Sequence, residues 1–180
     1  MKIPISKLKA MLLFFGTYTD KRLLGKTKLM KLFYFVDFGH VKKYGSPVTY
    51  DTYYHLDHGP TPSVIMDLVN EVGDDFDNAT LSDVISIEDK AGTLLKRIIP
   101  IREFTDEDAK YFSETELETM KAVCRRFETV NAKQIEEISH NDAPWKETKL
   151  PEEIPYTLAI KDKDAVASEE EINFILGLAK

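Results

Sequence analysis

Two groups of polar side chains have the types and spacing that metal binding or acid–base chemistry requires. Asp37 and His40 lie three residues apart, and His55, Asp57 and His58 follow within one short segment. Positions i and i+3 share a face of a helix, and carboxylate with imidazole is a ligand set that zinc or iron accepts. The spacing matches no established metal motif, however, and an Asp–His pair in an apolar helix is more often a buried hydrogen-bonded pair. We therefore expect no bound metal.

The sequence contains no motif typical of a catalytic centre. The nucleophile elbow G-x-S-x-G, the P-loop, H-E-x-x-H and G-x-G-x-x-G are all absent. The one cysteine, Cys124, has Val123 and Phe127 as neighbours in a segment with helical periodicity, which favours a buried structural thiol over a nucleophile. We expect no catalytic residue, no cofactor and no enzymatic activity.

The elements that must hold the polar residues are predicted to be mostly helices. Residues 5–18 are apolar at helical spacing, and residues 29–38 contain eight apolar side chains in ten. The second pattern continues to Tyr44 and is bounded by Gly25 and Gly45, which predicts a helix over 25–44. Because this helix is apolar on almost every side, we expect it at the centre of the core.

The segment that follows has a different residue composition, which predicts short strands. Residues 46–56 are rich in β-branched and aromatic side chains and indicate an extended segment. Thr61 is the expected N-cap and Pro62 the expected first residue of a helix that reaches Gly73, with an acidic loop over 73–80. Residues 84–88 and 94–101, joined by 89–92, have the pattern of a β-hairpin.

The C-terminal half contains four N-terminal capping patterns, each ahead of an apolar periodic run. The pairs are Ser113 with Glu116, Asn131 with Gln134, Ser168 with Glu171 and, more loosely, Thr105 with Asp108. They predict helices over 106–112, 114–129, 132–140 and 169–178. We expect one domain over residues 1–180 of the α+β class, mostly α-helical with a small antiparallel β-sheet or hairpin.

Charge is distributed unevenly along the chain. Residues 1–49 carry ten Lys or Arg and two Asp, a charge of +8, whereas the remaining residues carry 14 basic and 29 acidic side chains, a charge of −15. The basic residues alternate with core-type apolar ones, so we expect the two regions to fold against each other. With a pI of about 5.2 and no recognised nucleic-acid-binding module, the sequence does not favour nucleic acid as a partner.

The apolar run of residues 10–15 is too short to span a membrane, and no signal-cleavage pattern follows it. We expect no membrane partner and a cytoplasmic location.

Two blocks of residues resemble the Panacea domain, which occurs in SocA-like antitoxins and GepA-type phage-associated proteins. The first block comprises Lys28, Leu29, Lys31, Leu32, Tyr34, Asp37, His40, Gly59, Pro60 and Pro62. The second comprises Ser139, His140, Trp145, and then Ile154 and Tyr156. The resemblance covers about residues 5–177, and we expect most of these side chains to serve structure.

The resemblance implies an antitoxin of a toxin–antitoxin system that binds and neutralises a cognate protein toxin. One alternative is a proteolytic adaptor that delivers the toxin to a cellular protease, as at least one type of family member does. A further alternative is an unrecognised enzyme that uses Asp37 and His40.

The segment from Ser46 to Gly59 is the expected partner-binding site. An exposed strand edge offers unpaired backbone groups, and tyrosine is favoured at interface hot spots. The residues concerned are Tyr50, Tyr53, Tyr54, His55 and, on the neighbouring helix, Lys31. That the tyrosines instead pack inward on the helices is an equally open alternative.

Overall fold

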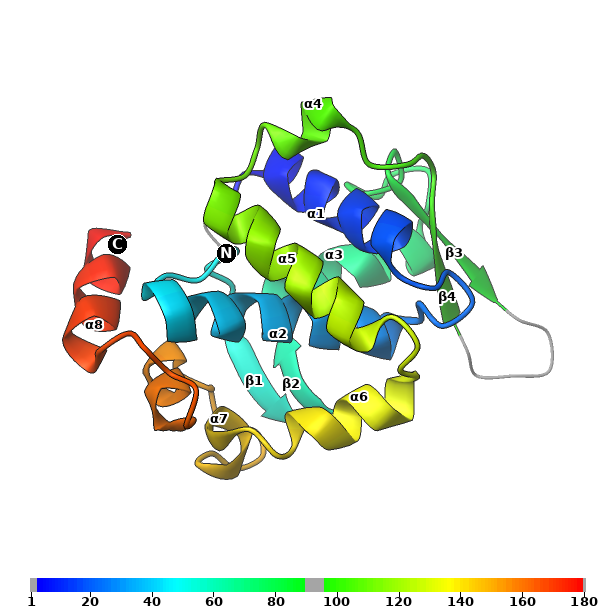
Figure 1. Ribbon diagram of the computed structural model, residues 1–180. Coiled ribbons are helices and arrows are strands. Elements are labelled where there is room, and N and C mark those ends of the chain that lie inside the picture. The colour runs from blue at the N-terminus through cyan, green and yellow to red at the C-terminus, as the bar shows by residue number, and fades with distance from the viewer. Residues whose placement is uncertain (1–2, 90–95, 180) are drawn as a thin grey trace.

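The computed structural model describes residues 3–89 and 96–179 and is built around one helix, α2 (Lys26–Tyr44). In Figure 1, α2 runs through the middle of the molecule, with α1 (Ile5–Tyr18) and α5 (Glu114–Phe127) on one side. Helix α2 is also contacted by the hairpin of β1 (Tyr53–Leu56) and β2 (Gly59–Pro62), by helix α6 (Ala132–Ser139) and by the 3₁₀ helix η1 (Tyr156–Lys161). The predicted mostly helical α+β fold is therefore confirmed.

Helix α2 is central because its sequence is apolar on nearly every side. Thirteen of its 19 residues are buried, as its pattern predicts. It begins after Gly25 and ends at Gly45, whose φ of 76° is left-handed, a conformation that favours glycine at a helix end. Helix α1 is also confirmed at its predicted bounds, and Phe15 packs edge-on against Phe33, with ring centroids 5.0 Å apart.

Two antiparallel hairpins supply all the strands of the described residues. Strand β1 (Tyr53–Leu56) pairs with β2 (Gly59–Pro62), and β3 (Ile85–Asp89) pairs with β4 (Lys96–Pro100). The second hairpin confirms the predicted one. The predicted Leu94 and the loop from Lys90 to Gly92 lie outside the described residues.

The start of α3 (Ser63–Asp74) differs from the prediction. Pro62 occupies the N-cap position and belongs to β2, and Thr61 does not cap the helix, because its hydroxyl donates to the Gly59 carbonyl oxygen at 3.0 Å. The Asp51 carboxylate accepts instead from the backbone N–H groups of Val64 at 3.2 Å and Ile65 at 2.8 Å. The predicted extended segment is a strand only from Tyr53 onward.

The capping patterns of the C-terminal half all form capping boxes. They begin α4 (Asp106–Ala109), α5, α6 and α8 (Glu169–Leu178) where predicted, although α4 and α5 end earlier than expected. Helix α7 (Ala143–Lys146) and η1 have too few residues to show a period, so the sequence pattern did not predict them.

Salt bridges join the basic N-terminal region to the acidic remainder. The pairs are Lys7–Glu116 at 2.6 Å, Lys9–Asp83 at 2.8 Å, Lys42–Asp162 at 2.7 Å and Lys43–Glu118 at 2.9 Å. The expectation that these regions fold against each other is confirmed. Within residues 3–89 and 96–179, none of the helices has the length and apolarity that crossing a membrane requires.

Candidate partner-binding surface

The Asp37 carboxylate, fully buried on α2, organises the chain from residue 48 to residue 53. Its Oδ1 accepts from the backbone N–H groups of Val48 and Thr49, each at 2.8 Å. Its Oδ2 accepts from the Thr49 hydroxyl and, at 2.9 Å, from the Tyr53 hydroxyl. The Tyr156 hydroxyl lies 3.2 Å from the same oxygen and 2.8 Å from the Asp51 carbonyl oxygen. These donors fix the loop that leads into β1.

Burial raises the pKa of Asp37, and the hydrogen bonds from Thr49, Tyr53 and Val48 oppose that rise. Every neighbour of the carboxylate is a donor, so the site is built to hold a chain segment in place. His40 lies in a separate contact, with Nδ1 at 2.6 Å from the Ser46 carbonyl oxygen and Nε2 at 3.2 Å from the Thr115 hydroxyl. Asp37 and His40 therefore do not share one ligand position.

The Lys31 ammonium, on the same helix, is 1% exposed and donates to the Pro60 carbonyl oxygen at 2.7 Å. Gly59 has a φ of 91°, and a Cβ there would lie 2.8 Å from the Ser139 hydroxyl and 3.0 Å from Lys31 Nζ. Glycine is thus required at this turn for both its backbone conformation and its lack of a side chain. Four residues of the family resemblance meet at this one contact.

A second contact ties β1 to the C-terminal half. The Trp145 ring stacks with two imidazoles, that of His55 at a centroid distance of 3.3 Å and that of His140 at 4.4 Å. His55 Nδ1 also lies 3.0 Å from the Thr148 hydroxyl. Burial lowers the pKa of both histidines, which favours neutral rings in this stack. Trp145 thereby anchors α7 against the hairpin.

The edge of β1 was expected to be open, and it is occupied. The His55 N–H donates to the Glu152 carbonyl oxygen, and the Ile154 N–H donates to the Tyr53 carbonyl oxygen, each at 2.8 Å. Tyr54 and Glu153 form the bridge between these bonds. Partner-strand addition at this edge would first have to displace residues 152–154.

The expected partner-binding residues divide between the core and the surface. Tyr53 and Lys31 are each 1% exposed, so neither side chain lies on the outer surface, and for Tyr53 the inward alternative is confirmed. His55 is half-buried against Trp145. Tyr50 is partly exposed and has a left-handed φ of 54°, which is strained for a non-glycine residue. Tyr54 is exposed.

Exposed apolar side chains extend from Tyr54 along the outer face of the hairpin. Tyr54 and Leu56 are two residues apart on β1, so they point to the same face, and they are 36% and 38% exposed. Leu150, from the loop before residues 152–154, is 54% exposed and lines one pocket with Leu56. We call Tyr54, Leu56 and Leu150 the β1 surface. Sequence reasoning missed Leu56 and Leu150, since apolar residues carry no signal of exposure without the fold.

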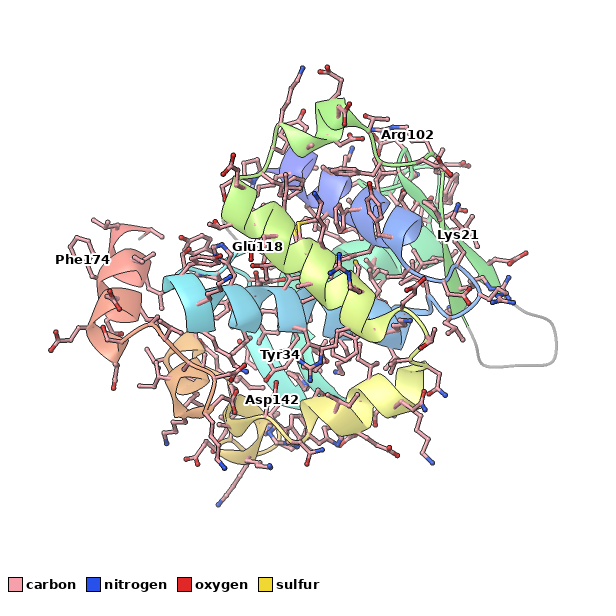
Figure 2. All side chains as sticks on the ribbon, in the orientation of Figure 1. Lys21, Tyr34, Arg102, Glu118, Asp142 and Phe174 are labelled. Carbon is pink, nitrogen blue, oxygen red and sulfur yellow. The ribbon has the colours of Figure 1, made fainter. Side chains whose placement is uncertain are left out.

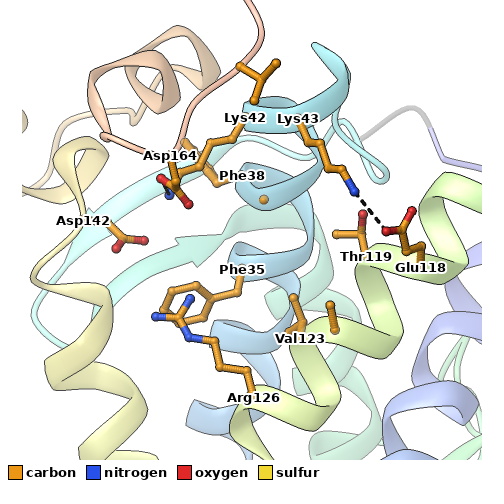
Figure 3. Close-up of a pocket in the computed structure, with 13 residues that line it drawn as sticks. Phe35, Phe38, Lys42, Lys43, Glu118, Thr119, Val123, Arg126, Asp142 and Asp164 are labelled. Carbon is orange, nitrogen blue, oxygen red and sulfur yellow. Dashed lines mark hydrogen bonds and ion pairs between the residues drawn. The ribbon is translucent and has the colours of Figure 1, made fainter.

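A second hollow, of about 340 Å³, lies between α2 and α5 (Figure 3). Its cations have partners: Lys43 pairs with Glu118, and Lys42 pairs with Asp162 at 2.7 Å and lies 3.6 Å from Asp164. The Arg126 guanidinium instead lies over the Phe35 ring, 5.3 Å from its centroid. At the rim, the Tyr34 hydroxyl donates to Asp142 at 3.3 Å (Figure 2).

The described residues form neither a metal site nor a reactive cysteine, and Lys28 does not extend a basic surface. Among residues 3–89 and 96–179, no three His, Cys, Asp or Glu side chains are grouped to hold a metal ion. Cys124 is buried, as expected, and burial raises the pKa of its thiol to about 12, so it is not a reactive nucleophile. Lys28, 0% exposed, donates to the Glu128 carbonyl oxygen at 3.2 Å and contributes nothing to a basic surface.

The family model described as "Antitoxin SocA-like, Panacea domain" matches residues 29–146, which is more than half of the chain. No curated protein and no solved structure matches the chain. The matched range contains the Asp37 network, the contact of Lys31 with the hairpin turn, and Trp145.

Proposed function

Because the chain belongs to the SocA-like antitoxin family with the Panacea domain, we propose that it is the antitoxin of a toxin–antitoxin pair. It acts in the cytoplasm, without catalysis, by binding its cognate protein toxin directly. The family match carries this proposal. The buried, donor-filled environment of Asp37 supports the non-enzymatic part of it, since no reactive group faces a substrate there.

We place the toxin contact on the β1 surface. An exposed tyrosine with two exposed leucines offers the aromatic and apolar anchor area that interface hot spots use. The network behind β1 holds this surface rigid, because Asp37 bonds Tyr53 and the edge of the strand is paired with residues 152–154. A rigid surface loses less conformational entropy when a partner binds.

Co-expression with the protein encoded by the adjacent gene tests the proposed function. We expect growth arrest by that protein alone, restored growth with this chain, and co-purification of the two proteins. Absence of both rescue and co-purification would contradict the proposal. A toxin whose half-life shortens when this chain is present would identify a proteolytic adaptor, whereas a toxin that persists in the complex identifies direct neutralisation.

The surface is tested by replacing its residues with serine in the same assay. Tyr54→Ser combined with Leu56→Ser is expected to weaken toxin binding at least about tenfold, the effect of losing one hot-spot anchor. Phe174→Ser is the matched control, because Phe174 is 67% exposed on α8, away from β1 (Figure 2). Equal binding by both variants, each with native melting, would place the toxin elsewhere.

A further inference from the structure

A pocket of about 420 Å³ opens between the start of α2, the turn from β1 to β2, and α3. Its apolar walls come from four side chains on different elements: Met30, Leu56, Met66 and Leu150. Pockets that hold small organic ligands have about 300–1,000 Å³ and mainly apolar walls with few polar groups. This pocket, which we call the Lys31 pocket, has both properties.

Two of the polar side chains that line the Lys31 pocket are lysines. Lys26 and Lys31 both line it, and neither has a carboxylate oxygen within 4.0 Å among the described side chains. Lys31 uses one of its three protons on the Pro60 carbonyl oxygen, and Lys26 donates to the Asn70 side-chain oxygen. The lysines of the hollow in Figure 3, by contrast, are both paired with carboxylates.

The end of α2 adds to this positive character. Lys26 and Thr27, the first two residues of the helix, line the pocket, and the N-cap Gly25 has no side chain to bond their backbone N–H groups. The start of a 19-residue helix carries a positive partial charge. The exposed Asp57 and His58 also line the pocket, and His58 lies 3.5 Å from Glu136.

Burying a charged ammonium group without a carboxylate partner costs free energy, and this cost lowers the pKa of the group. Burial lowers the pKa of Lys31 to about 7, and Glu136 opposes this only in part. A negative group placed in the pocket would compensate the charge that the fold leaves unpaired. The chain thus combines an uncompensated cation with an apolar cavity large enough for a ligand.

We propose that the Lys31 pocket binds a carboxylate carried on an apolar chain. The carboxylate lies against Lys31 and Lys26 at the start of α2, and the apolar chain lies along Met30, Met66 and Leu150. A free organic acid and the C-terminus of a peptide with an apolar last residue both supply this chemistry. The pocket shares Leu56 and Leu150 with the β1 surface, and its ligand binding can be tested with the chain alone, in the absence of a toxin.

Octanoate is the probe, and 1-octanol, of equal length and no charge, is its matched control. Titration followed by isothermal calorimetry is expected to give one saturable octanoate site, with 1-octanol at least about tenfold weaker, since a charge-assisted hydrogen bond contributes at least one factor of ten. Equal binding of octanoate and 1-octanol, or no binding of octanoate, would overturn the proposal.

Variants then place the site. Lys31→Met keeps an unbranched side chain, shorter by one atom, and removes the charge, and it should weaken octanoate binding at least about tenfold. Lys28→Met is the matched control, because Lys28 is also buried on α2 but does not line the pocket, and it should bind as the wild type does. Met66→Trp fills the pocket without touching a charge and should also abolish binding. If Lys28→Met loses binding and Met66→Trp retains it, the site is not this pocket.

The two sources of the carboxylate are separated by a peptide arm. Acetyl-Ala-Ala-Leu with a free C-terminus is compared with the same peptide as its C-terminal amide. Tighter binding of the free peptide than of octanoate identifies a chain end, and the reverse order identifies a small acid; either result supports the site. If the amide binds as well as the free peptide, the carboxylate is not what the pocket recognises.

Discussion

Asp37 and Lys31 are buried charges on the same helix, and the fold treats them in opposite ways. Asp37 is surrounded by donors from the backbone and from hydroxyl groups. Lys31 has one assigned acceptor and a pKa lowered to about 7. Both carboxylate oxygens of Asp37 accept hydrogen bonds, whereas the Lys31 ammonium has further N–H groups for which the described residues supply no acceptor. This difference is why we assign structure to Asp37 and ligand binding to Lys31.

Asp37→Asn should destabilise the protein by about 3 kcal/mol, the range for hydrogen bonds to a charged group and for an unpaired buried polar group. The amide N–H₂ would replace one carboxylate oxygen and face the N–H and hydroxyl donors of the 48–53 loop. Urea unfolding measures the change. Asp57→Asn, an exposed position beside β1, should change the free energy of unfolding by less than about 0.5 kcal/mol. Equal stability of the two variants would remove Asp37 from its organising role.

Lys31 should make stability rise with pH. Its pKa is about 7 in the folded chain and 10.5 as the ordinary value, so between these values the unfolded chain binds more protons than the folded chain. The free energy of unfolding therefore increases as pH rises through this window, and Lys31→Met should lose that increase. Urea midpoints between about pH 7 and about pH 8 stay below the ordinary pKa values of cysteine and tyrosine, so titration of those groups in the unfolded chain does not contribute. Parallel curves for the two proteins would contradict the lowered pKa.

The sequence pointed to Asp37, Lys31 and Gly59 through the family resemblance, but not to their partners. Asp51 caps α3 from outside it, and Tyr156 reaches the Asp37 carboxylate from a distant segment. Local patterns identify caps only within three or four residues, so a cap donated across a hairpin leaves no sequence signature. These two residues became visible only when the fold brought the segments together.

Helix α2 is the element on which the other elements pack, and its core positions set much of the stability. Leu32→Ala or Phe33→Ala should cost about 2–5 kcal/mol, since each side chain is 0% exposed and its removal leaves a cavity. Thermal and urea unfolding measure the loss. Phe174→Ala on α8 is the control, with an expected change below about 0.5 kcal/mol because that ring is exposed. Wild-type unfolding of both α2 variants would show that α2 is not central.

Helix periods and capping boxes predicted most helices, whereas the environment of β1 could not be predicted. The segment 46–56 has no clean alternation, so the side of β1 that faces the core was undetermined in the sequence. The edge of β1 is covered by residues 152–154, about 100 positions further along the chain. Strand pairing at that separation depends on the whole fold, which explains why an occupied edge was expected to be open.

Across the whole molecule, the family match and the packed core do not have the same bounds. The match covers residues 29–146, while one continuous core runs from Ile3 to Ile172. Helix α1 contributes eight buried residues, and residues 154–159 contribute Ile154 and Ala159 to the core and Tyr156 to the Asp37 network. The region that a family model matches and the unit that folds need not be the same length of chain.

A fragment of residues 29–146 should therefore fail to fold cooperatively. Without α1, the apolar face of α2 around Phe33 is exposed to water, and without residues 152–156 both the edge of β1 and the Asp37 carboxylate lose partners. A domain with about 5–15 kcal/mol of stability does not survive the loss of a core helix. Circular dichroism during heating should show a sigmoidal transition for residues 1–180 and a gradual slope for the fragment.

A fragment of 5–177 is the control and should melt as the whole chain does, since it keeps every one of these contacts. Cooperative melting of the 29–146 fragment would show that the matched region is a folding unit by itself.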